Sequence, residues 1–104
     1  GLQEFEGHAA IYPPGSFYKT HLDQFRGTSE RSVTAILYLN PDWQPADGGQ
    51  LRLYLDEACS EYRDIAPRAG TLVVFLAARF YHEVLTAHSE RIAITGWFKR
   101  RALG

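Results

Sequence analysis

The stretch that decides the fold is SVTAILYLN, residues 32–40. Successive side chains of an extended chain point to opposite faces. The stretch therefore divides into two sets, with Val33, Ala35, Leu37 and Leu39 on one face and Thr34, Ile36 and Tyr38 on the other. A period of two residues is typical of a β-strand and not of a helix, so residues 32–40 are predicted to form a strand.

Runs of the same character recur along the rest of the chain. Turn residues at 13–15, 48–49 and 69–70 separate several of them. The further predicted strands are residues 8–12, 16–22, 50–55, 71–76, 82–86 and 91–98. The link AHSE, residues 87–90, suits a hairpin between the last two. Helical periodicity is weak, and residues 56–64 are expected to form a polar loop with at most one turn of helix.

The composition favours an all-β fold in one domain. With 104 residues, of which 45% are hydrophobic and 22% charged, the chain is large enough for one core and not for two. Six Phe, six Tyr and two Trp, with many β-branched residues in short and regularly spaced runs, indicate a sandwich or barrel. About eight strands at this spacing predict a jelly roll with little helix.

Charge and cysteine content limit the partners and the compartment. A net charge of −1 provides no clustered basic face for nucleic acid, and the basic residues 99–101 are expected to be a solvated strand end. The single cysteine, Cys59, permits no internal disulfide and has acids rather than bases beside it, so it is assigned no role. The longest apolar run, residues 72–78, is too short to span a bilayer, and the N-terminus lacks a signal peptide. A soluble, cytoplasmic protein with no membrane partner is expected.

A histidine and a carboxylate two residues apart are the first candidates for chemistry. Residues two apart share a face of a strand, so His21 and Asp23 are expected to project together as ligands for a divalent metal. His82 opens a later predicted strand and would complete the two-histidine, one-carboxylate triad of non-haem iron(II) oxygenases. The alternative is a surface or hydrogen-bonded pair, since most short motifs of this kind bind no metal. His8 and His88 are assigned no role.

Arg91 is the second candidate, because it begins the last predicted strand. The side chains that share its face of that strand are a small residue, a hydroxyl and an aromatic ring: Ala93, Thr95 and Trp97. An arginine that points into a barrel is unfavourable unless an anion pairs with it, and its planar fork fits a carboxylate. Tyr38 could donate to the same carboxylate. The alternative is a salt bridge from Arg91 to Glu83, Glu90 or another acidic residue.

These residues, in this order, resemble a known family. The succession His21-x-Asp23, His82, Arg91 is similar to that of the Fe(II)/2-oxoglutarate-dependent dioxygenases. The resemblance is strongest to the prolyl 4-hydroxylase branch, which contains the hypoxia-inducible-factor prolyl hydroxylases and their bacterial relatives. The stretches that carry it follow the family's order over nearly the whole chain: YPPGSFYKTHLD, VTAILYLNPDW, GGQLRLY, DIAPRAGTLVVF, HEV and RIAITGWF.

The resemblance implies a fold and a set of residue roles. The fold is a double-stranded β-helix that holds iron between its two sheets, with His21, Asp23 and His82 as the iron ligands. Arg91 would grip the distal carboxylate of 2-oxoglutarate, and Tyr38 would donate to it. The other residues that match the family's pocket are Thr95 and Tyr12 beside the cosubstrate, Leu51 and Trp97 in the lining, and Tyr18 at the substrate entrance.

The same resemblance implies an enzyme that uses Fe(II), 2-oxoglutarate and O2, with ascorbate as a supporting reductant. Succinate and carbon dioxide would form while an unactivated C–H bond is hydroxylated, and a prolyl residue in a protein or peptide is the first candidate substrate. Asp23 at the carboxylate position favours hydroxylation over halogenation. One alternative is the same chemistry on a free amino acid or other small molecule. The other is a non-catalytic β-sandwich binding module, which needs no iron triad together with an anion clamp.

The chain also departs from the family's pattern. Tyr81 stands where many relatives have proline, and residues 24–31 are short for the loop that covers the protein substrate in the eukaryotic enzymes. The sequence has no counterpart of the N-terminal helical segment that usually supports the larger sheet. Residues 1–104 are therefore interpreted as a catalytic core, either a minimal domain or part of a longer protein. An exposed apolar sheet face would then favour a homodimer.

Overall fold

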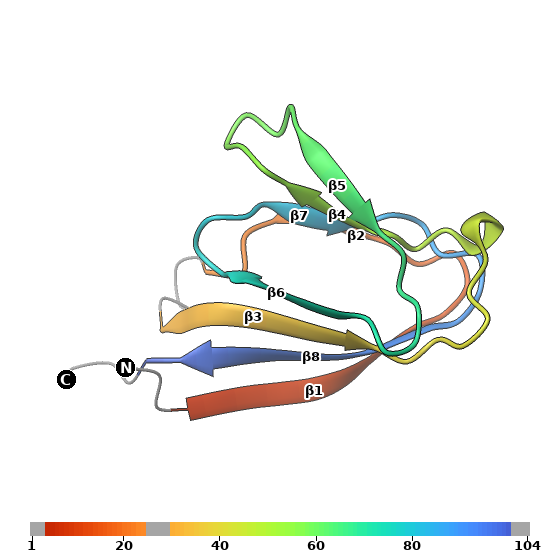
Figure 1. Ribbon diagram of the computed structural model, residues 1–104, viewed down its shortest axis with the longest axis horizontal. Coiled ribbons are helices and arrows are strands. Elements are labelled where there is room, and N and C mark those ends of the chain that lie inside the picture. Colours follow the sequence, from red (N-terminus) through yellow and green to blue (C-terminus); the bar gives the residue numbers. More distant parts are fainter. Residues whose placement is uncertain (1–3, 25–29, 101–104) are drawn as a thin grey trace.

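The computed structural model describes residues 4–24 and 30–100, which fold into two stacked antiparallel sheets (Figure 1). The strands are β1 (Glu4–Tyr12), β2 (Tyr18–His21), β3 (Arg31–Tyr38), β4 (Leu51–Tyr54), β5 (Tyr62–Ile65), β6 (Leu72–Leu76), β7 (His82–Val84) and β8 (Arg91–Lys99). One sheet has the order β1-β8-β3-β6 and the other the order β2-β7-β4-β5. The predicted jelly roll, or double-stranded β-helix, is confirmed.

The connections between strands differ from the prediction at one place. The hairpin expected between residues 82–86 and 91–98 is wrong, because β7 pairs with β2 and β4 whereas β8 pairs with β1 and β3. The link between them has the length of a hairpin loop, but its backbone bonds to other loops: Ala87 N donates to Ser16 O, and Thr86 O accepts from Gly49 N. The link therefore crosses from one sheet to the other, and these hydrogen bonds hold it against the neighbouring loops. The hairpin of the fold is formed by β4 and β5 (Figure 1).

The segment predicted as a polar loop, residues 56–64, contains the start of a strand. β5 is an edge strand beside β4, and most of its residues are exposed. The polar side chains of an exposed edge hide the alternating pattern, which explains why the strand was missed. The short helical element of the described chain lies elsewhere, as a 3-10 turn at Pro45–Asp47. β1 also begins at Glu4, before the predicted start at residue 8.

The core is built on the face of β3 that carries the hydroxyl groups. Thr34, Ile36 and Tyr38, which the alternation in SVTAILYLN placed together on one face, are all buried. The side chains that pack together between the sheets are Ile36, Tyr38, Leu51, Val73, Phe75 and Ala93. Burial of each large apolar side chain of this kind stabilises the fold by about 1.5–3 kcal/mol. The core fills only part of the space between the sheets, and the rest is the cavity described below.

The outer face of the β1-β8-β3-β6 sheet is apolar along its length. Its exposed large side chains are Phe5, Ile11, Leu72, Val74, Leu76, Ile94 and Phe98. Contiguous apolar surface of this kind is uncommon on monomeric proteins. The exposed apolar face expected from the sequence is therefore present, and self-association through it stays a prediction.

Some expectations fall on parts of the chain that the structure leaves undescribed. Most of the loop at 24–31, and Arg101 of the basic C-terminal run, lie outside the described residues. Over residues 4–24 and 30–100, no helix is long and apolar enough to pass through a membrane.

Candidate functional site

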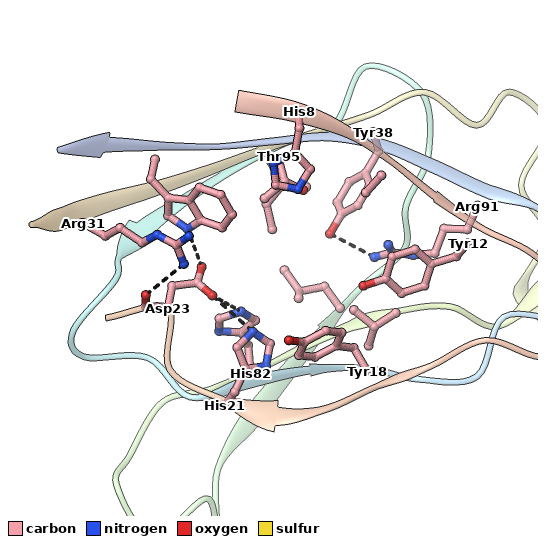
Figure 2. A pocket seen from close by; sticks show the side chains of 15 residues that line it. His8, Tyr12, Tyr18, His21, Asp23, Arg31, Tyr38, His82, Arg91 and Thr95 are labelled. Atoms are coloured by element: carbon pink, nitrogen blue, oxygen red, sulfur yellow. Dashed lines mark hydrogen bonds and ion pairs between the residues drawn. The ribbon is translucent and has the colours of Figure 1, made fainter. Parts of the chain in front are cut away.

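A cavity of about 360 Å³ lies between the two sheets and collects every residue expected to form a site. Those residues are Tyr12, Tyr18, His21, Asp23, Tyr38, Leu51, His82, Arg91, Thr95 and Trp97. Figure 2 shows their side chains pointing inward from both sheets. Asp23 and the two histidines lie at one end of the cavity, and Arg91 lies at the other. The cavity thus has two polar ends with an aromatic and aliphatic lining between them.

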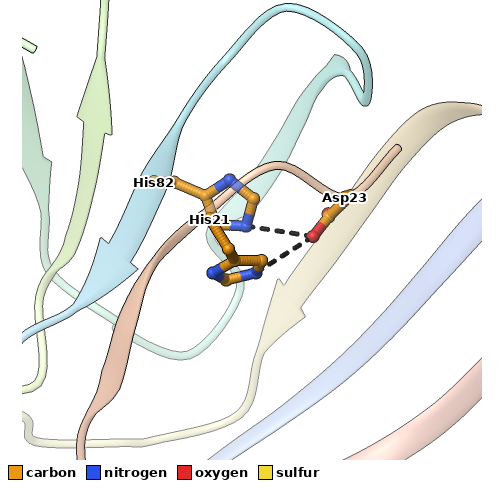
Figure 3. Close-up of side chains that lie close together, drawn as sticks. All are labelled: His21, Asp23 and His82. Carbon is orange, nitrogen blue, oxygen red and sulfur yellow. Dashed lines mark ion pairs between the residues drawn. The ribbon is translucent and has the colours of Figure 1, made fainter. Parts of the chain in front are cut away.

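The first polar end is a cluster of His21, Asp23 and His82 (Figure 3). Nε2 of each histidine lies 3.2 Å from the same carboxylate oxygen, Oδ1 of Asp23. The potential ligand atoms of the three residues all lie within 4.8 Å of one another. Asp23 and His82 are buried, and His21 is partly exposed. Two imidazoles and one carboxylate at this separation could hold a divalent metal ion on one side of its coordination sphere.

The two histidines are positioned by strand pairing, but Asp23 is not. His21 ends β2 and His82 begins β7, and the two residues are direct partners in the register of these strands. Asp23 lies in a bend after the end of β2. The expectation that His21 and Asp23 project together is correct, although they do not share the face of one continuous strand. A register shift between Tyr18 and His21 also turns both of these side chains toward the cavity.

Each histidine is held through its other ring nitrogen. Nδ1 of His21 lies 2.8 Å from the carbonyl oxygen of Lys19, and Nδ1 of His82 lies 3.0 Å from that of Phe80. A carbonyl only accepts, so each Nδ1 carries the proton and a neutral ring has its lone pair on Nε2. Both lone pairs then face a carboxylate oxygen, which is repulsive unless a proton or a cation lies between them. Orientation of this kind is typical of metal-binding histidines, and the donor set fits a divalent cation.

The protonation equilibria of the cluster reflect the same contacts. Burial alone would raise the pKa of Asp23, but hydrogen bonds to His21 and His82 outweigh it and hold that pKa well below its usual range. Burial alone would lower the pKa of His21, but hydrogen bonds to Asp23 and to the Lys19 carbonyl outweigh it and raise that pKa above 6.5. A proton on His21 therefore competes with a metal ion for the same nitrogen.

Divalent metal is expected to stabilise the fold, and the effect should shrink in acid. Mn(II) at about 100 times its dissociation constant would add roughly 2.7 kcal/mol, which raises the melting temperature by on the order of 10 °C. His21 is protonated below its raised pKa, so the gain should be largest above that pKa and fall as the pH falls through it. Thermal unfolding followed by circular dichroism, with EDTA as the reversal, measures both effects. A melting temperature that Mn(II) does not change would contradict a metal site here.

The second polar end is the guanidinium of Arg91, which is 3% exposed. Its Nε donates to the carbonyl oxygen of Gly49 at 2.7 Å, and its Nη2 donates to the hydroxyl of Tyr38 at 3.3 Å. Within the described residues no carboxylate pairs with it, so the alternative salt bridges to Glu83 and Glu90 are not formed. A buried cation without an anionic partner is costly. Its position at the end of a cavity fits a ligand that carries a carboxylate.

A glycine turn gives Arg91 room at this end of the cavity. Gly49 has a φ of +65°, and a Cβ there would lie 3.1 Å from Cδ of Arg91 and 3.1 Å from a ring carbon of Trp43. Two phenol rings flank the guanidinium, with centroids 5.2 Å (Tyr12) and 5.0 Å (Tyr38) from its carbon. Burial raises the pKa of both phenols although Arg91 opposes it, so both are neutral O–H donors near neutral pH. One fixed cation with phenol donors beside it suits a carboxylate.

The remaining predicted residues take distinct places in the cavity. Tyr18 is 50% exposed with its ring centroid 4.4 Å from that of His21, so it lies at the rim beside the His–Asp–His cluster. Leu51 is fully buried, and Thr95 lies in the lining. Trp97 does more than line the cavity, because its Nε1 donates to Oδ2 of Asp23 at 3.1 Å.

Two polar residues of the lining were not predicted from the sequence. His8 lies on β1 and lines the cavity with its ring centroid 5.4 Å from that of Trp97. Its even spacing from Tyr12 could have placed it on the inward face. Arg31 has its guanidinium carbon 3.7 Å from the centroid of the Trp97 ring. A register shift between Arg31 and Val33 alters its pairing, and simple alternation along β3 gives no signal for that.

Comparison with known proteins places the chain in one family. Residues 7–99 match the model of the 2OG-Fe(II) oxygenase superfamily. Among curated proteins, Egl nine homolog 1 of Rattus norvegicus is 40% identical over 92 residues, which are 86% of this chain and 27% of that protein. The chain therefore spans about a quarter of the length of this relative.

Solved structures agree with the sequence match. A Pseudomonas putida prolyl-4-hydroxylase superposes with a TM-score of 0.91 at 55% identity, covering 97% of this chain and 55% of that one. A prolyl hydroxylase from Trichoplax adhaerens, solved in complex with a peptide fragment of the hypoxia inducible factor oxygen degradation domain, gives 0.84 at 37% identity, covering 93% and 44%.

Proposed function

Because the chain belongs to the 2OG-Fe(II) oxygenase superfamily, we propose that it is the catalytic core of an Fe(II)- and 2-oxoglutarate-dependent prolyl hydroxylase. Its substrate is a prolyl residue in a protein or peptide, as the names of several relatives suggest. One observation carries the proposal. A single cavity has a His–Asp–His cluster at one end and, at the other, a buried arginine that pairs with no carboxylate of residues 4–24 and 30–100.

The proposed roles follow from the contacts of each residue. His21, Asp23 and His82 hold Fe(II), since their ligand atoms converge and both imidazoles are oriented from behind by backbone carbonyls. Arg91 binds the distal carboxylate of 2-oxoglutarate, and Tyr38 donates a hydrogen bond to the same group. The remaining contributors are Tyr12 and Thr95 beside the cosubstrate, and Leu51 and Trp97 in the wall.

The iron ion and the side chains have different tasks in the proposed reaction. Bound Fe(II) supplies the activation of dioxygen, which no side chain of the cavity can perform. The chain's own residues orient the cosubstrate between the two ends, with Arg91 fixing one carboxylate and the metal cluster receiving the opposite end of the molecule. The buried side chains of Ile36, Leu51 and Trp97 in the wall would limit the access of water to the reacting atoms. The overall reaction converts 2-oxoglutarate, O2 and a C–H bond to succinate, CO2 and an alcohol, with ascorbate as supporting reductant.

The entrance to the cavity supports a substrate that stays partly outside. Tyr18 is half exposed at the rim, next to the partly exposed His21. A prolyl ring can enter beside this tyrosine while the flanking peptide remains on the surface. The face of an aromatic ring offers a large apolar surface against which the apolar prolyl ring can pack.

Turnover of the cosubstrate tests the proposed function. With Fe(II), 2-oxoglutarate, O2 and ascorbate, the protein is expected to form succinate slowly even without a prime substrate, and the rate should fall to background when EDTA removes the metal. Mass spectrometry quantifies succinate. A folded, iron-loaded sample that forms none would favour a non-catalytic binding module. Proline-containing peptides, each matched with a Pro→Ala control peptide, then test the substrate class by the gain of one oxygen atom.

A further inference from the structure

We propose that Thr34 and Trp97 are positioning residues that fix the Asp23 carboxylate so that only one of its oxygens serves the metal. The inference rests on the proposed metal centre and deepens it. It assigns a task to two buried side chains outside the ligand set. The sequence analysis placed Trp97 only in the wall of the pocket and gave Thr34 no place in the site.

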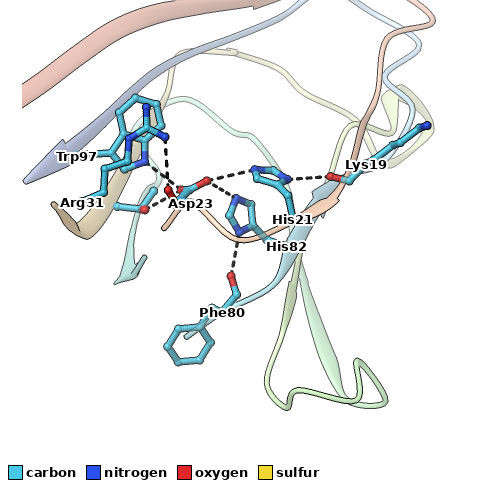
Figure 4. A network of polar contacts seen from close by, with 8 residues as sticks. Lys19, His21, Asp23, Arg31, Phe80, His82 and Trp97 are labelled. Atoms are coloured by element: carbon cyan, nitrogen blue, oxygen red, sulfur yellow. Dashed lines mark hydrogen bonds and ion pairs between the residues drawn. The ribbon is translucent and has the colours of Figure 1, made fainter. Parts of the chain in front are cut away.

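The two oxygens of Asp23 have different surroundings (Figure 4). Oδ1 faces Nε2 of both histidines. Oδ2 accepts a hydrogen bond from Oγ1 of Thr34 at 2.7 Å and another from Nε1 of Trp97 at 3.1 Å. One oxygen therefore faces the ligand cluster, while the other is engaged by two donors.

The two donors are held rigidly by the sheet. Thr34 on β3 and Trp97 on β8 are direct partners in the register of these strands. Thr34 has no exposed surface, and Trp97 is 8% exposed. Hydrogen bonds to a carboxylate are strong in such a dry environment. The pair forms a fixed cradle for Oδ2 on the sheet that faces the two histidines.

Arg31 restrains the indole of this cradle. Its guanidinium carbon lies 3.7 Å from the centroid of the Trp97 ring, within the range of a cation–π contact. Its Nη1 also lies 3.4 Å from the backbone oxygen of Asp23, to which it donates. A cation over the ring draws electron density from the indole, which makes its N–H a better donor toward Asp23.

The cradle has a consequence for the metal. To bring both oxygens to one ion, the carboxylate would have to rotate and break two buried hydrogen bonds. Asp23 therefore offers one oxygen, and with two imidazoles it leaves three positions free on an octahedral ion. Without the cradle, the carboxylate would be free to chelate through both oxygens or to turn away, so both the affinity and the geometry of the metal would change.

Mn(II) binding to the full chain tests this without recourse to turnover. Free Mn(II) is measured by its electron paramagnetic resonance signal, and the spectrum of the bound ion reports its coordination. Thr34→Val keeps the shape and removes the hydroxyl, and Trp97→Phe removes the indole N–H. Each is expected to weaken Mn(II) binding by about 10–100-fold, as is typical of groups that orient a ligand, and to change the bound-ion spectrum. Thr34→Ser, which keeps the hydroxyl, is expected to bind like the unmodified chain.

Matched controls separate this role from a general loss of packing. Ser32→Ala removes another β3 hydroxyl, which faces the carbonyl of Glu30, and Trp43→Phe removes a buried indole that donates to Gly48 at 2.9 Å. Both should leave Mn(II) affinity unchanged. The inference is overturned if Thr34→Val and Trp97→Phe bind Mn(II) normally, or if Thr34→Ser binds it as weakly as Thr34→Val. It is also overturned if the two control variants lose as much Mn(II) affinity. An unmodified chain that binds no Mn(II) would instead refute the metal centre itself.

Discussion

Asp23→Ala is expected to abolish metal-dependent turnover of 2-oxoglutarate. The substitution removes the one carboxylate of the cluster and leaves two histidines with no charge to balance a divalent ion. The loss should exceed the 10–100-fold typical of residues that only orient a ligand, for Mn(II) affinity and for succinate formation alike. Calorimetric titration with Mn(II) and the succinate assay measure the two losses.

The control for Asp23 is an aspartate on the other sheet. Asp64 pairs with Arg52 on the β4–β5 hairpin, outside the cavity. Asp64→Ala removes a carboxylate that faces solvent, and surface pairs of this kind contribute little to stability. It should keep both Mn(II) binding and turnover. Asp23→Ala with normal Mn(II) affinity would be incompatible with the proposed ligand set.

Arg91→Gln is expected to raise the requirement for 2-oxoglutarate while metal binding stays intact. Glutamine keeps hydrogen-bonding groups but loses the charge that grips the distal carboxylate. Truncating one partner of a buried, hydrogen-bonded charge pair costs about 2–5 kcal/mol. The apparent KM for 2-oxoglutarate should therefore rise by roughly 30-fold or more. Initial rates of succinate formation at increasing 2-oxoglutarate give the value.

Two comparisons make the Arg91 result decisive. Arg79→Gln changes an exposed arginine that does not line the cavity, and it should leave KM unchanged. Mn(II) affinity of Arg91→Gln should match that of the unmodified chain, since Arg91 lies at the opposite end of the cavity from the metal cluster (Figure 2). If Asp23→Ala and Arg91→Gln weakened Mn(II) and 2-oxoglutarate equally, the division of roles between the two ends would be wrong.

The sequence predicted the parts of this molecule that depend on alternation within a strand. The period of SVTAILYLN predicted that Thr34, Ile36 and Tyr38 share a face, and the structure shows that this face is the buried one. The inward face of β8, from Arg91 to Trp97, follows in the same way. A strand of several residues repeats its signal enough times for the pattern to identify the strand and to divide its side chains between two faces.

The parts that depend on long-range pairing or on irregular backbone were harder to predict from the sequence. The length of AHSE allowed either a hairpin or a crossover, and only the pairing of β7 with β2 and β4 decides between them. β5 was missed because an exposed edge strand tolerates polar residues on both faces. Asp23 reaches the cluster from a bend, so strand periodicity pointed to this residue without describing its backbone.

The sequence pattern did not predict the contacts that hold the Asp23 carboxylate in place. Thr34 and Trp97 lie far apart in the chain, and their common contact with Asp23 depends on the register between β3 and β8. Arg31 approaches the same place beside a register shift that alternation does not encode. The resemblance to a family supplied the proposed ligand set, whereas the cradle around Oδ2 required coordinates.

The central claim is that the metal cluster and Arg91 hold opposite ends of the same 2-oxoglutarate molecule. It is tested by calorimetric titration of 2-oxoglutarate, without O2, into metal-free and Mn(II)-loaded protein. If the ligand touches both ends, Mn(II) should tighten 2-oxoglutarate binding at least about fivefold, and by linkage 2-oxoglutarate should tighten Mn(II) binding by the same factor. An affinity for 2-oxoglutarate that is the same with and without Mn(II) would contradict the account.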